Sequence, residues 1–131
     1  MDLDQAMIIA GVGCRRGASA NEIEAAIAAA LAECKLAANA LGLIASAEAK
    51  ADEVGIVDAA AALGARLVLV SQAALVEAGE RVITKSERVQ ELMGIPSMAE
   101  AAVLAAGRTN ARLLAPRIVV GPVTCALGEV P

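Results

Sequence analysis

Short apolar runs alternate along this chain with longer segments that have helical periodicity. Met7 to Val12, Leu43 to Ser46 and Arg66 to Val70 have the length and composition of buried strands. Segments with apolar residues at spacings of three and four separate these runs. Parallel neighbouring strands need such crossover segments between them. The pattern therefore predicts an α/β fold with three layers, α/β/α, around a mostly parallel or mixed sheet of about five strands.

The first predicted helix has a well-marked start. Ser19 and Glu22 form an S-x-x-E capping box, in which the hydroxyl accepts from a free backbone N–H and the carboxylate accepts from the N–H of the cap residue. Gly42 is expected to end this helix. One apolar stripe lies along it, formed by Ile23, Ile27, Ala30, Leu31 and Cys34.

The next helices are predicted from periodicity and from serine caps. A helical pattern between Asp52 and Leu63, with Ile56 and Ala60 on the same face, is closed by Gly64. Ser86 is placed to cap a short helix over residues 88–93.

The last third of the chain contains a second capping box and two short strand candidates. Ser97 and Glu100 form the box, and the helix that follows ends at Gly107. Arg112 to Leu114 and Pro116 to Val120 are predicted to be closing strands.

Composition limits the class of protein. The 131 residues are 58% hydrophobic, and the mean hydropathy is +0.65. The longest uncharged stretches, Leu36 to Ala47 and Ile118 to Gly128, are shorter than the roughly 18 residues that span a bilayer, so no membrane association is expected. The N-terminus is acidic and lacks the basic region of a secretory signal. We expect one domain over residues 1–131, located in the cytoplasm.

Two residue classes are missing altogether. Without histidine the chain cannot form a Ser-His-Asp or Cys-His pair of the usual kind. Without aromatic residues, and with a net charge of −4, it lacks the stacking platforms and positive groove that single-stranded nucleic acid needs. Nucleic acid is therefore not an expected partner. The chain has three widely spaced cysteines, Cys14, Cys34 and Cys125, and this odd number favours reduced thiols over disulfides or a zinc site. We expect neither a metal nor a cofactor.

The glycine-rich segment GVGCRRG is the strongest candidate for a binding site. Gly11, Gly13 and Gly17 lie in a turn between a strand and a helix N-terminus, where backbone N–H groups and the helix dipole favour an anion. Arg15 and Arg16 add guanidinium groups, which bind carboxylates through paired hydrogen bonds. The alternative is that the glycines merely permit the turn and the arginines are solvated.

A nucleotide is a weaker alternative ligand for this turn. The dinucleotide motif requires its third glycine three positions after the second, but Arg16 stands there and Gly17 comes one place late. A Walker sequence is also missing from the chain.

Cys14 is a candidate nucleophile. Its position beside two arginines and close to a helix N-terminus predicts a lowered thiol pKa. The alternative is a small apolar side chain that is simply packed at a strand end. Cys34 and Cys125 are predicted to lie in the core.

A second charged segment, SAEAKADE, follows a strand. It places Ser46, Lys50, Asp52 and Glu53 at the carboxyl end of that strand, where open parallel sheets bind ligands, so we expect it to face the same crevice as the glycine turn. A surface charge cluster is the alternative. For Ser86 and Ser97, helix capping alone is a sufficient explanation.

Three motifs in this order identify a family. They are GVGCRRGAS at residues 11–19, S-x-x-x-K-x-D-E-x-G at residues 46–55, and V-x-x-x-x-G-I-P-S-M-A-E-A-A-V-L at residues 89–104. The chain resembles, over nearly its whole length, the family formed by the C-terminal domain of cobalt-precorrin-5A hydrolase (CbiG) and its small stand-alone relative CobE. Its length is similar to that of the stand-alone form.

The resemblance implies a role in vitamin B12 biosynthesis. The expected ligand is a precorrin or corrin-pathway tetrapyrrole that this protein carries to the next enzyme, and other cobalamin-biosynthesis enzymes are the expected protein partners. The alternative activity is that of the larger relatives, hydrolysis of a precorrin lactone, with Cys14 or a water activated by Glu53 or Glu100 as the attacking group. A family lysine near the final strands is replaced here by Arg117, which cannot act as a neutral amine base.

A precorrin carries acetate and propionate carboxylates around an apolar macrocycle, which suits cations gathered in one crevice. Thr124 is included in the predicted site through the resemblance alone. The full set of predicted ligand-binding residues is Gly11, Gly13, Cys14, Arg15, Arg16, Gly17, Ser19, Ser46, Lys50, Glu53, Ser86, Ser97, Glu100, Arg117 and Thr124.

Overall fold

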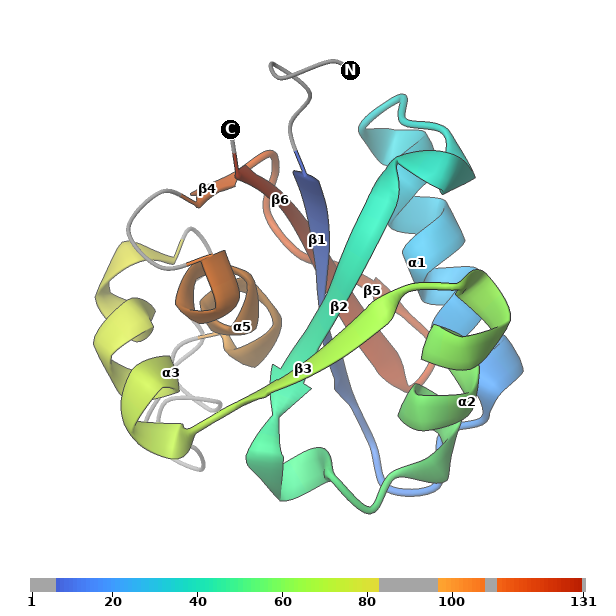
Figure 1. Cartoon of the computed structure of the whole chain (residues 1–131), viewed down its shortest axis with the longest axis horizontal. Coiled ribbons are helices and arrows are strands. Elements are labelled where there is room, and N and C mark those ends of the chain that lie inside the picture. The colour runs from blue at the N-terminus through green and yellow to red at the C-terminus, as the bar shows by residue number, and fades with distance from the viewer. Residues whose placement is uncertain (1–6, 83–96, 108–110, 131) are drawn as a thin grey trace.

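A mixed sheet forms the centre of the molecule (Figure 1). The structure, a computed structural model, describes residues 7–82, 97–107 and 111–130. Six strands pair in the order β3-β2-β1-β6-β4, and β5 also pairs with β6. The first three strands are parallel, whereas β6 is antiparallel to β1, β4 and β5. The strands are β1 (Met7–Cys14), β2 (Leu41–Ala47), β3 (Arg66–Val70), β4 (Arg112–Leu113), β5 (Ile118–Val120) and β6 (Val123–Val130).

Helices cover both faces of this sheet, which confirms the predicted α/β architecture. The first helices, α1 (Ala20–Glu33) and α2 (Val54–Leu63), lie against one face. The other face carries α3 (Gln72–Ala78) and α5 (Met98–Gly107). None of the helices in the described ranges is long and apolar enough to cross a membrane.

Alternating side chains of β1 divide the core in two. Ile8 and Val12 pack toward α1 and α2, whereas Ile9 packs toward α3 and α5. Gly11 lies directly beneath α5, because a Cβ at this position would collide with the carbonyl oxygen of Ala99. The missing side chain lets α5 lie against β1 with its N-terminus near the carboxyl end of the strand.

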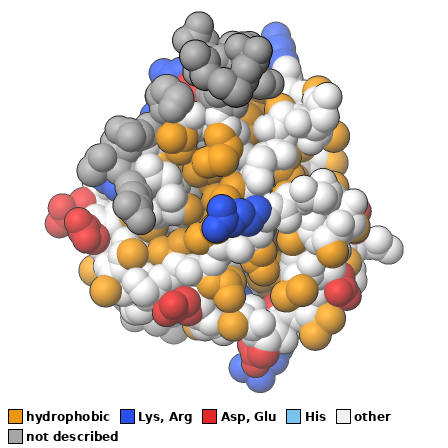
Figure 2. Space-filling model, in the orientation of Figure 1, with side chains coloured by type: hydrophobic (Ala, Val, Ile, Leu, Met, Phe, Trp, Pro, Cys, Tyr) orange, Lys and Arg blue, Asp and Glu red, His pale blue; other side chains and the backbone are white. Residues whose placement is uncertain are grey.

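The sheet edge at β3 is apolar and open on the face shown in Figure 2. Hydrophobic side chains form a band over the middle of this face, a Lys or Arg side chain lies at its centre, and the other visible charged groups lie around it. Leu67, Val68 and Leu69 of β3 are each only half-buried. The polar features of the predicted site lie elsewhere, at the carboxyl end of β1.

The first helix ends earlier than predicted. Gly42 lies inside β2, and α1 ends at Glu33. Lys35 adopts the left-handed conformation, with a φ of 58°, that usually favours glycine. The N–H groups of Lys35 and Leu36 donate to the carbonyls of Ala32 and Leu31, which are the paired bonds of a Schellman motif. A lysine thus ends the helix, and the glycine expected to do so is part of a strand.

Two elements were missed by the sequence analysis. The helix α3 begins at an N-cap, Ser71, whose hydroxyl accepts from the Ala74 N–H. The strand β6 contains Cys125 and lies mostly within the uncharged stretch Ile118 to Gly128, for which no strand after Val120 is predicted. By contrast, Gly64 closes α2 in the left-handed conformation, as predicted. The short helix predicted at residues 88–93, with its cap Ser86, lies outside the described residues.

Candidate functional site

The turn after β1 is held in place by hydrogen bonds from two other segments. The Arg15 N–H donates to the Pro122 carbonyl over 2.9 Å, which joins the turn to the β5–β6 hairpin. Gly17 has a φ of 82° and donates its N–H to Glu53 Oε1 over 2.9 Å. Ser19 then starts α1 through the predicted capping box with Glu22. The turn that carries Arg15 and Arg16 is therefore fixed at both ends.

A cleft of about 260 Å³ lies between this turn, the β5–β6 hairpin and the start of α5. It brings together five residues of the predicted site that come from opposite ends of the sequence: Gly13, Cys14, Arg15, Arg117 and Thr124. The other residues that line it are Met98, Val119, Gly121 and Pro122, which sequence reasoning missed. The signal for the last three was the Gly121-Pro122 turn between two apolar runs, which is typical of a hairpin.

The cleft is positive, although the whole chain is acidic. Arg15 is exposed and Arg117 is half-buried, and none of the described residues that line the cleft carries a carboxylate. The buried Glu100 carboxylate, which accepts the Arg117 N–H, does not line it. Low-dielectric walls concentrate the field of such charges inside a cleft. The geometry therefore suits an anionic ligand.

Gly13 and Thr124 form the floor of the cleft. They lie opposite each other on β1 and β6, and the Thr124 hydroxyl donates to the Gly13 carbonyl over 3.2 Å. A Cβ at Gly13 would lie only 2.8 Å from Thr124 Oγ1. Glycine at this position thus leaves room for the threonine hydroxyl beside the arginines.

Glu100 positions the segment that carries Arg117. Its side chain is fully buried in the first turn of α5, and its Oε2 accepts the Arg117 N–H over 2.8 Å. The carboxylate thus links the start of α5 to the segment before β5. Glu53 has the same relation to the glycine turn, since its Oε1 accepts the Gly17 N–H. Both candidate bases therefore bind backbone groups of the segments that carry the arginines.

The hydroxyl bond of the second predicted capping box is not formed. Ser97 is fully buried, and within the part of the chain that the structure describes its hydroxyl has no hydrogen-bond partner. The hydroxyl therefore does not cap α5, although the helix begins at Met98 as the sequence predicted. The missing bond leaves a buried polar group immediately before a residue that lines the cleft.

The predicted lowering of the Cys14 pKa is also wrong. Burial raises the pKa of the Cys14 thiol above its ordinary value of 9.0, Lys50 lowers it and Glu53 raises it. The desolvation of the thiol at the strand end outweighs the favourable cation. Burial likewise raises the pKa of Cys125, to about 12. All three cysteines are free thiols.

Ser86 lies outside the described residues, and the remaining residues of the predicted site do not line the cleft. Arg16, Gly17 and Glu53 border a second hollow of about 340 Å³ at the start of α2. Lys50 ends a short 3-10 helix, Glu48–Lys50. Ser46 is fully buried, and its hydroxyl donates to the Val12 carbonyl over 2.7 Å.

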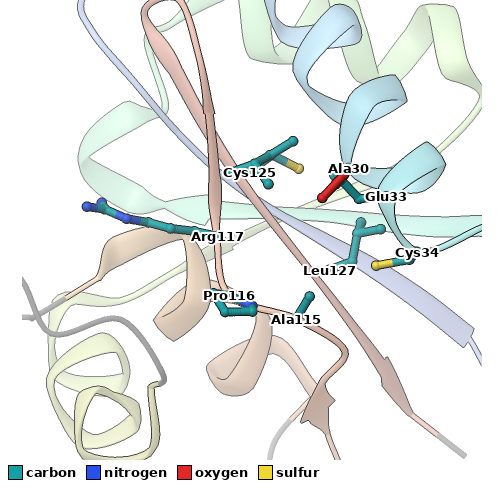
Figure 3. Close-up of a pocket in the computed structure, with 9 residues that line it drawn as sticks. Ala30, Glu33, Cys34, Ala115, Pro116, Arg117, Cys125 and Leu127 are labelled. Atoms are coloured by element: carbon teal, nitrogen blue, oxygen red, sulfur yellow. The ribbon is translucent and has the colours of Figure 1, made fainter.

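A third hollow, of about 240 Å³, lies between α1 and the segment that precedes β5 (Figure 3). Cys34, Cys125 and Leu127 line it, and so does Arg117. In Figure 3 the Arg117 side chain points away from these residues. Glu33 adds a carboxylate to this mostly apolar hollow, which the Arg117 guanidinium does not enter. In the described ranges, no group of three or more Cys, Asp or Glu side chains is arranged to hold a metal ion.

Comparison with known proteins shows the family to which this chain belongs. A family model described as "Cobalamin synthesis G C-terminus" matches residues 8–128. Protein CobE of Sinorhizobium sp is 33% identical over 120 residues, which cover 92% of this chain and 78% of that protein.

Two solved structures are also similar. One is CobE, a protein from the cobalamin (vitamin B12) biosynthetic pathway, with a TM-score of 0.89, 30% identity, and coverage of 96% of this chain and 92% of that one. The other is the cobalamin biosynthesis protein chiG from Agrobacterium tumefaciens str. C58, with a TM-score of 0.69, 38% identity, and coverage of 92% and 96%.

Proposed function

This chain belongs to the family of CobE and the cobalamin synthesis G C-terminal domain, and from that premise we propose that it binds a tetrapyrrole intermediate of cobalamin biosynthesis in the Arg15–Arg117 cleft. In this proposal the protein carries the intermediate, in the cytoplasm, to the next enzyme of the pathway. The observation that supports it is the meeting of Arg15 and Arg117, about a hundred residues apart in sequence, at one cleft without a lining carboxylate.

The chemistry of such an intermediate fits the cleft. Guanidinium groups bind carboxylates through paired, charge-assisted hydrogen bonds. Thr124 adds a hydroxyl to the same cleft, and Met98 and Val119 supply apolar surface for the macrocycle. Since the chain lacks aromatic residues, the ligand would be held by its carboxylates and by aliphatic contacts.

The hydrolase alternative has less support. The pKa of Cys14 is raised by burial, which leaves little thiolate at neutral pH. Glu53 and Glu100, the two candidate bases, each accept a backbone N–H at short distance. A group that already holds the backbone is poorly placed to take a proton from an attacking water.

A titration of the protein with pathway intermediates tests binding. The ligand absorbs at wavelengths where a protein without Trp or Tyr is transparent, so absorbance reports the complex directly. We expect Arg15→Ala and Arg117→Ala each to weaken binding by about ten-fold or more, because a hydrogen-bonded charge pair contributes about 1.5–3 kcal/mol. Arg66→Ala is the matched control, since Arg66 is exposed at the start of β3, away from the cleft. Equal affinity of all three variants would overturn the site.

Product analysis separates the carrier from the hydrolase. After incubation with a precorrin lactone, the carrier proposal predicts that chromatography and mass spectrometry recover the ligand unchanged. Catalytic conversion, lost in the Cys14→Ala or Glu53→Gln variant, would instead establish the hydrolase.

A further inference from the structure

The size of the Arg15–Arg117 cleft limits how much of a tetrapyrrole it can hold. Its volume is about 260 Å³, whereas pockets that enclose a drug-sized ligand measure about 300–1,000 Å³. A tetrapyrrole with its acid side chains is larger than such a ligand. The hollow of about 340 Å³ shares no lining residue with the cleft, and the hollow of about 240 Å³ shares only Arg117 with it.

We infer that the cleft takes one corner of the macrocycle edge-on, a single pyrrole-type ring with its acetate and propionate side chains, and leaves most of the ring system outside the described surface. This inference rests on the proposed function and specifies its binding mode. The arginines provide one guanidinium for each carboxylate of such a ring, from two segments that meet at the cleft.

The walls of the cleft fit a small ring between two acid groups. Gly13 and Thr124 form a floor without bulky side chains. Val119 lies on the same cleft and is 64% exposed, which is high for a large apolar residue. An apolar ring edge that rests on Val119 would remove this side chain from water.

The backbone at both arginines is fixed by hydrogen bonds to other segments. The Arg15 N–H donates to the Pro122 carbonyl, and the Arg117 N–H donates to the buried Glu100 carboxylate. A backbone that is already fixed loses less conformational entropy on binding. A ligand held by one corner also presents its remaining carboxylates to an acceptor enzyme.

Competition between a whole tetrapyrrole and one of its corners tests the inference. The whole ligand is uroporphyrin, which carries acetate and propionate groups on every ring, and its visible absorbance reports binding. The competitor is a monopyrrole that carries one acetate and one propionate group, and its dimethyl ester is the uncharged control. We expect the diacid to displace uroporphyrin and the ester to fail. We also expect Arg15→Ala and Arg117→Ala to weaken the binding of uroporphyrin and of the diacid by similar factors.

The outcomes separate the binding mode from the function. If uroporphyrin binds in an arginine-dependent way but the diacid cannot displace it even at millimolar concentration, the edge-on mode is overturned and the proposed function stands. If neither acid binds, and pathway intermediates also fail to bind, both are overturned.

The solvent accessibility of the bound pigment provides a second measurement. Acrylamide should quench the fluorescence of bound uroporphyrin nearly as efficiently as that of the free pigment, because an edge-held ring keeps its faces in water. A fall of about ten-fold would mean that the protein encloses the ring, and would overturn the inference.

Discussion

Gly11 sets the distance between α5 and the sheet. A Cβ at this position would collide with the Ala99 carbonyl and approach Val103 Cγ2 to 2.7 Å. We expect Gly11→Ala to lower the free energy of unfolding by about 1–3 kcal/mol, because overpacking a core contact forces the backbone to shift. Denaturant titration measures the loss.

The control for this substitution is Gly42→Ala, also within a strand. A Cβ there would come closest to Met7 Cγ, at 2.9 Å, and this side chain is flexible and 41% exposed. We expect a smaller loss of stability than for Gly11→Ala. Equal losses would mean that contact with α5 is not what requires glycine at position 11.

The buried thiols predict a pH dependence. In the folded protein the pKa of Cys14 is raised from 9.0, and that of Cys125 is raised to about 12. Iodoacetamide should therefore modify both residues more slowly in the native than in the unfolded protein at neutral pH, since the thiolate is the nucleophile. Peptide mass spectrometry gives the rate at each cysteine. Faster modification of native Cys14 than of unfolded Cys14 would contradict the burial effect and restore Cys14 as a candidate nucleophile.

The raised pKa of Cys125 also makes the free energy of unfolding depend on pH. A pKa raised on folding means that the native state keeps its proton where the unfolded chain has lost it. The contribution of Cys125 is therefore fully present below pH 9 and is lost as the pH rises toward about 12. Denaturant unfolding at several alkaline pH values should show this loss, and Cys125→Ala should reduce it.

Two helix starts with similar sequences differ in their bonding, and serine substitutions should distinguish them. Ser19 caps α1 in a complete capping box, so Ser19→Ala should lower the free energy of unfolding by about 1 kcal/mol. Ser97 is buried without a partner for its hydroxyl in the described structure. Removing an unsatisfied buried hydroxyl is close to neutral or stabilising, so Ser97→Ala should lack the penalty.

Thermal unfolding of both variants provides the comparison. A loss for Ser97→Ala as large as that for Ser19→Ala would show that the hydroxyl caps α5 in solution after all. Ligand titration of the same variant adds a separate result. Weaker binding at unchanged stability would show that the Ser97 hydroxyl contacts the ligand.

Local chemistry explains which elements were predictable. The capping box at Ser19 and the left-handed Gly64 depend on residues close in sequence, so the pattern alone located one end of each of the two helices. The end of α1 depends instead on Lys35 in a conformation that side chains rarely adopt. The role of β6 depends on pairing with β1, more than a hundred residues away, which no local pattern contains.

The candidate site likewise combines features set by residues close in sequence with features set by distant residues. The glycine turn and its arginines were found from their own sequence, and Arg117 and Thr124 only through the family resemblance. That these segments share a cleft depends on the pairing of β1 with β6 and of β6 with β5. The backbone bonds of Glu53 and Glu100 could not be predicted, because each joins residues far apart in the chain.

At the scale of the whole molecule, two electrostatic effects oppose each other. The chain carries a net charge of −4, which repels a ligand with several carboxylates, whereas Arg15 and Arg117 attract it locally. Salt screens both effects, and the Debye length falls from about 30 Å at 0.01 M to about 8 Å at 0.15 M. The sign of the salt dependence therefore shows which effect governs binding.

We expect the affinity for uroporphyrin to fall as salt rises, because the arginines meet carboxylates at close range while the net charge acts from a distance. The double variant Arg15→Ala, Arg117→Ala removes the attraction and makes the net charge more negative by two, so its weaker binding should become insensitive to salt or should strengthen with it. Arg66→Ala removes one positive charge away from the cleft and should keep the wild-type direction. Titrations from about 0.01 to 0.3 M salt provide the measurement. An unchanged salt slope in the double variant would assign the attraction to cations elsewhere on the protein and remove Arg15 and Arg117 from the site.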